Sequence, residues 1–255
     1  MKKSVGLMLA FVVLVLSSSM AYGASVVGEG KENGMTPSGL SRSEIENTID
    51  AYVEENKGTT AALSVAVFGH KDIYMEKAYG YTDMENKKAN DKDAVFEWGS
   101  MTKLLTWVSV MQLAEKEKID LNGDIRQYLP EGFLTKVKFE GSITMLNLMN
   151  HTAGWQETAT DLFLEDKKDV KGLEDALKLI EPDQIFEPGT LVAYSNWGAA
   201  LAAYIVERVS GQTFDSYVHK NIFEPLGMGH TALNADLSDN EWVLNKRKEL
   251  KCYTT

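Results

Sequence analysis

The stretch Ala94-Val-Phe-Glu-Trp-Gly-Ser-Met-Thr-Lys103 carries the strongest chemical signal in this chain. A short apolar run passes through Gly99 into Ser100 and a helical pattern follows, which predicts Ser100 at a helix N-terminus. Residues three apart on a helix share one side, so the Ser100 hydroxyl and the Lys103 amine are expected to face the same way. A serine hydroxyl is a weak nucleophile, and a desolvated lysine can activate it by accepting its proton. The pattern predicts acyl transfer through Ser100.

The tetrapeptide Ser100-Met-Thr-Lys103 is weak evidence alone, because about one S-x-x-K is expected by chance in a chain of this composition. The alternative is that Ser100 only caps the helix while Lys103 lies solvated on its surface. A catalytic role is favoured by the position, because the helix dipole would stabilise an oxyanion at this N-terminus. The residues that follow at helical spacing and predict one buried stripe are Leu104, Leu105, Val108, Met111 and Ala114.

A second signature follows much later in the chain. Phe186-Glu-Pro-Gly189 predicts a turn, Leu191 to Tyr194 a short extended segment, and Tyr194-Ser-Asn196 the start of a helix that Gly211 ends. A tyrosine beside a lysine can take the serine proton and later return one to the leaving group. The alternative is an ordinary core tyrosine, with Asn196 as the helix N-cap.

The chain upstream of these motifs predicts a helix and a hairpin. Ser41-x-x-Glu44 is a capping box, and apolar residues recur at helical spacing as far as Glu55. Two runs rich in β-forming residues, 61–68 and 73–81, are separated by a turn that contains His70, which we expect to be solvated.

Composition excludes several classes of function. The chain has 44% apolar and 25% charged residues, ordinary for a globular protein, and no linker divides it, so we expect one folding unit. A net charge of −11 without a basic stripe argues against nucleic acid as a partner. The four histidines lack metal-ligand spacing and Cys252 is the only cysteine, so neither a metal nor another cofactor is predicted.

The N-terminus resembles a secretory leader. Lys2 and Lys3 precede an apolar run from Val5 to Leu16, and small residues follow. We expect a signal peptide over 1–23, a flexible lead-in over 24–40 and one domain over 41–255, in an extracytoplasmic protein, secreted or associated with the cell envelope. The alternative is an uncleaved N-terminus that associates with the membrane.

These motifs together resemble those of the serine β-lactamase and penicillin-binding protein superfamily, in particular its class C β-lactamase-like hydrolases. Two further stretches carry the resemblance: Leu148-Met-Asn-His-Thr-Ala-Gly154 matches an L-x-x-H-T-S/A-G pattern, and Pro225 to Met228 reads P-L-G-M. The resemblance implies an α+β fold, an α/β sandwich plus an all-α lobe, of the β-lactamase/transpeptidase type.

The resemblance also implies roles for the matched residues. Ser100 would be the acylated nucleophile, Lys103 and Tyr194 its proton-handling pair, and Asn196 a hydrogen-bonding partner near the lysine and the substrate. Which of Lys103 and Tyr194 is the general base stays open. His151 is expected to belong to a structural bend without a catalytic role. The neighbouring segment Trp155-Gln-Glu157 either rims the cleft or, as we favour, forms surface loop.

One motif of the family is missing. No K-T-G or H-x-G follows Asn196, although the family carries one on a strand that lines the cleft. We therefore expect a C-terminally truncated chain that lacks the last strands and helix of the sheet domain and one oxyanion donor.

The favoured function is that of an exported serine hydrolase that forms an acyl-enzyme with D-Ala-D-Ala peptides, β-lactams or small esters. Its partner would be a small molecule or a peptidoglycan peptide, and the oligomeric state stays open. One alternative is a penicillin-binding or sensing module that is acylated without turnover. Another is an inactive fragment.

Overall fold

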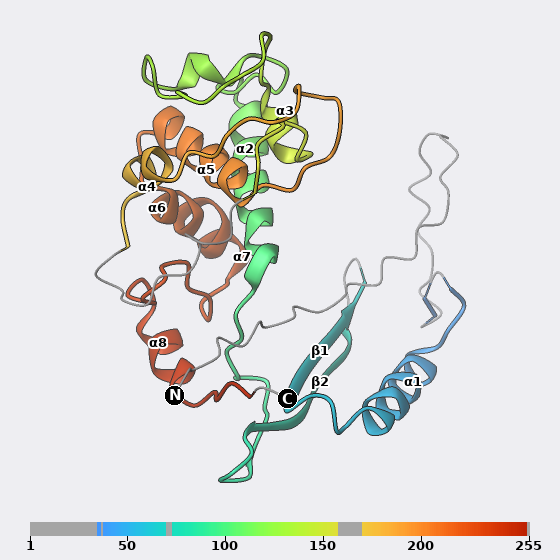
Figure 1. Cartoon of the computed structure of the whole chain (residues 1–255). Coiled ribbons are helices and arrows are strands. Elements are labelled where there is room, and N and C mark those ends of the chain that lie inside the picture. Colours follow the sequence, from blue (N-terminus) through green and yellow to red (C-terminus); the bar gives the residue numbers. More distant parts are fainter. Residues whose placement is uncertain (1–34, 37, 70–72, 158–169, 254–255) are drawn as a thin grey trace, which may run out of the picture. The chain divides into compact units, whose positions relative to one another are not determined.

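The computed structural model describes residues 35–36, 38–69, 73–157 and 170–253, which fall into two compact units. Unit 1 comprises the chain up to Glu97 together with 245–255, and unit 2 is Trp98–Leu244 (Figure 1). The predicted signal peptide over 1–23 and most of the lead-in over 24–40 lie outside the described residues. Within the described ranges, no helix is long and apolar enough to cross a membrane.

The predicted hairpin is confirmed, and it forms the sheet of unit 1. Strand β1 runs antiparallel to β2, from Ala62 opposite Gly80 to Val67 opposite Met75. Strand β3 pairs with the far end of β2, so the strand order is β1-β2-β3. The predicted turn residue His70 lies outside the described residues. The elements of unit 1 are α1 (Arg42–Glu55), β1 (Ala62–Phe68), β2 (Ile73–Asp83) and β3 (Lys88–Ala89).

Helix α1 begins at the predicted capping box. The Ser41 backbone N–H donates to Glu44 Oε2 (2.8 Å), and the Glu44 N–H donates to Ser41 Oγ (3.3 Å), so two unpaired donors of the first turn are satisfied. Further along, Asp50 accepts hydrogen bonds from Lys77 Nζ (2.8 Å) and Tyr79 Oη (2.7 Å) of β2. These contacts fasten the helix to the sheet.

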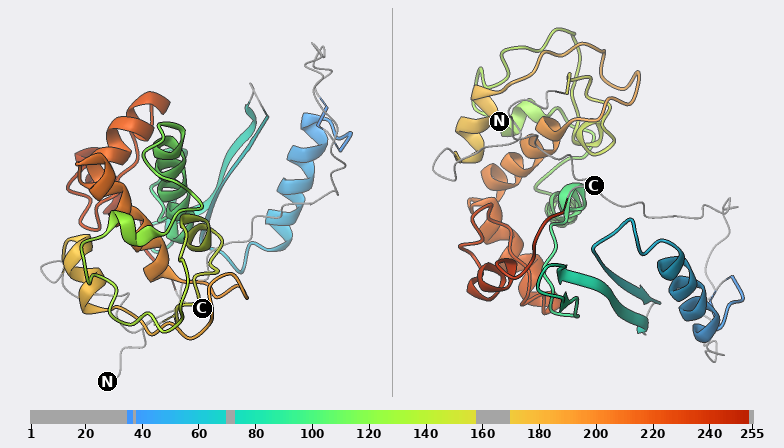
Figure 2. Two further views of the ribbon diagram at one scale, coloured as in Figure 1. Left: turned by 90° about the horizontal axis from the view of Figure 1, so that it is seen from above. Right: turned by 60° about the horizontal axis from the view of Figure 1, so that its bottom comes forward.

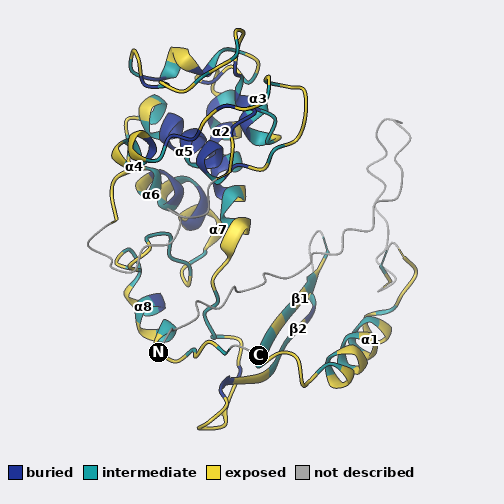
Figure 3. Ribbon diagram, in the orientation of Figure 1, coloured by how far each residue is buried: buried dark blue, intermediate teal, exposed yellow. Residues whose placement is uncertain are grey.

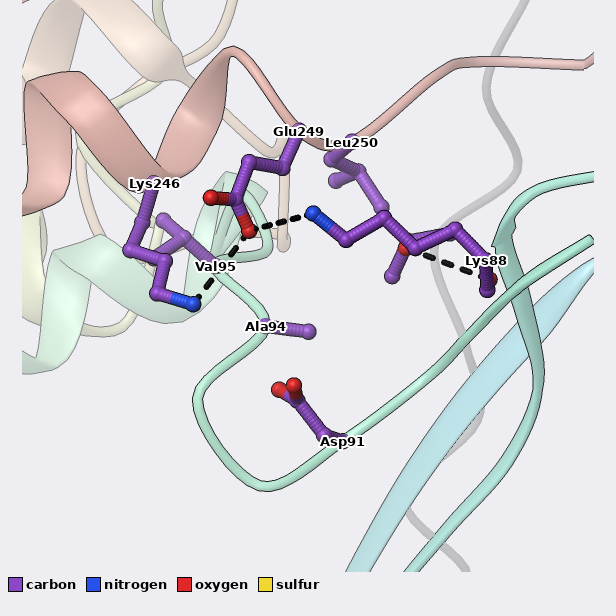
Figure 4. A pocket seen from close by; sticks show the side chains of 8 residues that line it. Lys88, Asp91, Ala94, Val95, Lys246, Glu249 and Leu250 are labelled. Carbon is purple, nitrogen blue, oxygen red and sulfur yellow. Dashed lines mark hydrogen bonds and ion pairs between the residues drawn. The ribbon is translucent and has the colours of Figure 1, made fainter. Parts of the chain in front are cut away.

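The end of the described chain lies against the sheet of unit 1. The Lys251 N–H donates to Thr82 O (2.9 Å), and Glu249 bridges Lys88 (2.7 Å) and Lys246 (3.2 Å) in the small pocket of Figure 4. Such exposed ion pairs contribute about 0–1 kcal/mol each. The pocket contains none of the predicted site residues, which all belong to unit 2.

Unit 2 is helical and packs around α5, which lies beside α2 (Figures 1 and 2). Most of α5 is buried (Figure 3), and Trp197 in its first turn meets Trp155 edge to face at 4.7 Å. The helices of unit 2 are α2 (Lys103–Glu115), α3 (Met145–Met149), α4 (Leu173–Leu179), α5 (Asn196–Ser210), α6 (Phe214–Val218) and α7 (Glu224–Leu226), with α8 (Glu241–Arg247) at its boundary; short 3₁₀ turns cover Gly99–Thr102 and Ile125–Tyr128, and a π-helical turn covers His219–Phe223.

The predicted buried stripe of α2 is wrong in part. Leu104 is 53% exposed and Met111 is 42% exposed, although both belonged to that stripe. Leu105 is the member of that stripe that is buried, and the buried residues of α2 are Leu105, Thr106, Ser109, Val110 and Leu113. Ser109 fits among them because its hydroxyl donates to Leu105 O (2.7 Å), which satisfies it inside the core. Since α2 is apolar on most sides, its pattern did not single out the face that packs on α5.

The predicted helix after the second motif is confirmed as α5. Ser195 is its N-cap, accepting from the Gly198 N–H (2.9 Å), so the alternative of Asn196 as the cap is wrong. Gly211 ends the helix in a left-handed conformation (φ +71°), which glycine adopts without steric cost. The predicted extended segment 191–194 forms no strand.

Candidate active site

Ser100 lies on the 3₁₀ turn Gly99–Thr102, which leads directly into α2, so it is at a helix N-terminus as predicted, although that first turn is 3₁₀ and not α-helical. A 3₁₀ helix has 3.0 residues per turn, so side chains at i and i+3 lie one above the other. The Lys103 Nζ accordingly donates to Ser100 Oγ at 3.2 Å. The spacing of the motif thus brings the amine to the hydroxyl, even though the local helix differs from the one expected.

The second motif meets the first at the same hydroxyl. The Tyr194 Oη donates to Ser100 Oγ at 2.8 Å, and Lys103 Nζ lies 4.8 Å from the centre of the Tyr194 ring. Lys103 Nζ also donates to Asn196 Oδ1 at 2.5 Å. The structure therefore brings all four predicted residues together within unit 2. The Tyr194 side chain remains accessible, because the residue is 45% exposed.

Backbone hydrogen bonds join segment 151–154 to segment 185–193, which leads into Tyr194. The Ala193 N–H donates to His151 O (2.7 Å), the Gly189 N–H to Thr152 O (2.8 Å), and the Ile185 N–H to Gly154 O (2.8 Å). Each pair links the H-T-A-G segment to the chain that leads into Tyr194. This segment is therefore a structural support, as expected.

The predicted turn before Tyr194 is also present. The Thr190 N–H donates to Glu187 O (3.2 Å), with Pro188 second and Gly189 (φ +82°) third in the turn. Proline at the second position and a positive φ at the third are the requirements of a type II turn. The E-P-G-T sequence thus reverses the chain, so that segment 191–194 can run back to the H-T-A-G segment.

His151 packs against Tyr194. Among the described residues, it forms no hydrogen bond with Ser100, Lys103 or the Tyr194 hydroxyl. Its ring packs on the Tyr194 ring at 4.3 Å, and its Nδ1 accepts from the Ser195 N–H (3.2 Å). An accepting Nδ1 carries no proton, so the ring is neutral in this arrangement. Burial, and then the positive charge of Lys103, lower the pKa of His151 from its usual 6.5.

We expect the His151 ring to titrate below pH 6.5 in the folded protein. Because the unfolded chain then binds the proton more readily, this group stabilises the fold fully above pH 6.5, and its contribution is lost as the pH falls through the folded pKa. The measurement is an NMR titration of the imidazole C–H resonances, assigned by their loss in His151→Gln. A midpoint at or above 6.5 would contradict the structure.

The segment after Gly154 differs from the expected surface loop. Trp155 is fully buried and packs on Trp197 in the core of unit 2. Glu157 is exposed, but its carboxylate accepts from the Asn196 backbone N–H (2.6 Å) and from Asn196 Nδ2 (3.1 Å). Glu157 thus belongs to the site. The motifs gave no signal for it, because a single glutamate in a loop has no diagnostic spacing.

The arrangement is suited to nucleophilic catalysis. One hydroxyl, Ser100 Oγ, has an amine and a phenol within hydrogen-bond reach, and either group can take the hydroxyl proton once it has itself lost a proton. Asn196 Oδ1 accepts from the amine, and Glu157 in turn accepts from Asn196. In the part of the chain that the structure describes, no group of three or more potential metal-ligating side chains occurs.

The motifs and the fold agree with the comparison to known proteins. The sequence profile of the family described as Beta-lactamase matches residues 45–245, which is most of the chain. The chain belongs to the β-lactamase family. The superfamily of serine β-lactamases and transpeptidases consists largely of serine hydrolases, and the expected fold type is confirmed.

Individual relatives show how much of the family this chain spans. It is 27% identical over 195 residues to "Protein flp" of Staphylococcus aureus (strain MRSA252), covering 73% of this chain and 38% of that protein. It is 29% identical over 191 residues to a "Beta-lactamase" of Escherichia coli (strain K12), covering 74% of this chain and 48% of that protein. The chain thus spans less than half the length of these curated relatives.

A solved structure shows the fold alone. The "Beta-lactamase/D-alanine Carboxypeptidase from Yersinia pestis complexed with citrate" superposes with a TM-score of 0.64 at 22% identity, covering 78% of this chain and 57% of that one. At that level of identity, the likeness concerns the path of the backbone and not the substrate.

Proposed function

We propose that this chain carries the acylation site of an exported serine hydrolase with Ser100 as the nucleophile. The observation that carries the proposal is the convergence of Lys103 Nζ (3.2 Å) and Tyr194 Oη (2.8 Å) on Ser100 Oγ. Family membership supports it, since the matched region 45–245 contains all three residues. Because the chain spans less than half of its curated relatives, the activity of a whole protein is part of the proposal.

The reaction proceeds in two balanced steps. In the first, Ser100 Oγ bonds to the carbonyl carbon of an ester or amide while its proton passes to Lys103 Nζ or Tyr194 Oη. The bond between the carbonyl carbon and the leaving group then breaks, and the leaving group takes a proton from Lys103 or Tyr194. In the second step, water attacks the acyl carbon, and Ser100 regains its proton as the acid is released. The pair of proton carriers therefore serves both steps.

The proposed substrates are D-Ala-D-Ala peptides, β-lactams and small esters, each with a carbonyl carbon that a serine can attack. The test is to incubate the full chain with a penicillin, a D-Ala-D-Ala tripeptide and a p-nitrophenyl ester, and to follow product release and protein mass. A mass increase on the peptide that contains Ser100, followed by steady turnover, supports the hydrolase. A burst without turnover would support a penicillin-binding sensor instead, and no adduct with any compound would contradict both.

Replacing Tyr194 by Phe is expected to slow acylation by about 10²-fold or more, because the ring stays in place on His151 while the oxygen beside Ser100 Oγ is lost. The measurement is the rate of Ser100 labelling by a fluorophosphonate. Tyr81→Phe is the matched control, since Tyr81 is also 45% exposed and lies outside the site. A rate within threefold of the wild type would show that Lys103 alone handles the proton.

We also propose export, on the strength of the leader-like sequence that begins with Lys2 and Lys3. Expression with the full N-terminus should give a mature protein whose first residue lies near Ala24. An intact N-terminus on protein in the membrane fraction would support the uncleaved anchor, and intact protein in the cytoplasm would exclude export.

A further inference from the structure

The side-chain amide of Asn196 is engaged at both of its ends. Its Oδ1 accepts from Lys103 Nζ (2.5 Å), and its Nδ2 donates to Glu157 Oε1 (3.1 Å). An asparagine amide has an acceptor at one end and a donor at the other. A neighbour that binds the Nδ2 end of the Asn196 amide therefore leaves the Oδ1 end for the neighbour on the opposite side.

We propose that Glu157 is a positioning residue that orients Asn196 toward Lys103. An ionised carboxylate accepts hydrogen bonds and donates none, so it selects the Nδ2 end of Asn196 and leaves Oδ1 for Lys103. In the flipped amide, the Nδ2 donor would face the amine donors of Lys103, and the carbonyl oxygen would face a carboxylate. Both contacts would be lost. This role rests on the proposed acylation of Ser100.

A second contact ties Glu157 to the start of α5. The Asn196 backbone N–H, one of the first-turn donors without a partner inside the helix, donates to Glu157 Oε2 at 2.6 Å. The N-cap Ser195 satisfies a different donor, that of Gly198. A negative charge is also favoured near a helix N-terminus. The two carboxylate oxygens of Glu157 thus bind the backbone N–H and the side chain of Asn196, which fixes the Asn196 side-chain amide relative to α5.

The first test is Glu157→Gln in the full chain. Glutamine keeps the size of the side chain but replaces one acceptor by a donor, so it cannot accept both Asn196 hydrogen bonds. We expect the maximal rate of Ser100 labelling by a fluorophosphonate to fall by about 10- to 100-fold. The matched control is Glu131→Gln, an exposed carboxylate of unit 2 remote in sequence from these motifs, which should label as the wild type does.

A double-mutant cycle separates positioning from a general loss of structure or charge. If Glu157 acts through Asn196, Glu157→Gln should cost nothing further in the Asn196→Ala background, so the double variant should label as fast as Asn196→Ala alone. Losses that multiply, or a Glu157→Gln rate within threefold of the wild type, would overturn the inference.

Thermal unfolding compares the wild type, the two single variants and the double variant, and this measurement does not depend on activity. Non-additive midpoints show that the contact between Glu157 and the Asn196 side chain exists in solution, and additive midpoints would overturn that contact. The hydrogen bond to the Asn196 backbone N–H remains in Asn196→Ala, so it does not enter the comparison. The two levels of the argument fail differently. A wild type that does not label at Ser100 would overturn the proposed function, and the role of Glu157 toward Lys103 with it. A labelled wild type with independent losses would overturn the role of Glu157 alone.

Discussion

Replacing Ser100 by Ala should abolish acyl-enzyme formation and reduce hydrolysis by about 10⁴-fold or more, the largest effect that we expect on activity. The reason is that Ser100 Oγ is the atom on which Lys103 Nζ and Tyr194 Oη converge. Mass spectrometry after incubation with a labelled penicillin or a fluorophosphonate measures the adduct directly.

The control for this prediction is Ser142→Ala, which removes an exposed hydroxyl of unit 2 remote in sequence from both motifs. It should label at the wild-type rate and to the same extent. An adduct that persists in Ser100→Ala would show that another residue is the nucleophile, and the interpretation of the site would fail.

Replacing Gly154 by Ala should have the largest effect on stability, lowering the free energy of unfolding by about 3 kcal/mol or more. The backbone there has φ +85°, which L-residues with a Cβ rarely adopt, and a Cβ would lie 2.0 Å from Phe186 O. The loop that carries Phe186 would have to move, and with it the hydrogen bond from the Ile185 N–H to Gly154 O. Chemical denaturation measures the loss.

Gly211→Ala separates backbone strain from this clash. Gly211 has a similar φ of +71°, but nothing lies within 4 Å of the position that a Cβ would take. We expect a loss of about 1 kcal/mol there, from the strained backbone alone. Equal losses in the two variants would show that the close approach to Phe186 has no energetic consequence.

The two predictions concern parts of the chain that the sequence reveals to different degrees. The motifs predicted the four residues that the structure brings together, because each belongs to a short motif in which residue type and spacing are set by the chemistry. They are Ser100, Lys103, Tyr194 and Asn196. Spacing was a robust guide even where the local structure differed. Ser100 lies on a 3₁₀ turn instead of an α-helix, yet a residue three positions later is on the same side in both.

The errors arose where the pattern was ambiguous or too short. Helix α2 carries apolar residues on most of its faces, so periodicity could not show that Leu105 is buried while Leu104 is 53% exposed. The segment Trp155-Gln-Glu157 was assigned to surface loop as a whole. Its members have opposite environments, with Trp155 in the core and Glu157 on Asn196, and three residues are too few to show a period.

The sequence by itself determined the family, the hairpin and the capping box of α1, and it singled out the four motif residues that the structure brings together, because these depend on local geometry and on side-chain chemistry. Only the tertiary structure decided which face of α2 is buried, how the H-T-A-G segment supports Tyr194, and that Glu157 meets Asn196. Those contacts join residues distant along the chain. Their partners are chosen by packing and by the need to satisfy hydrogen bonds, which no local pattern records.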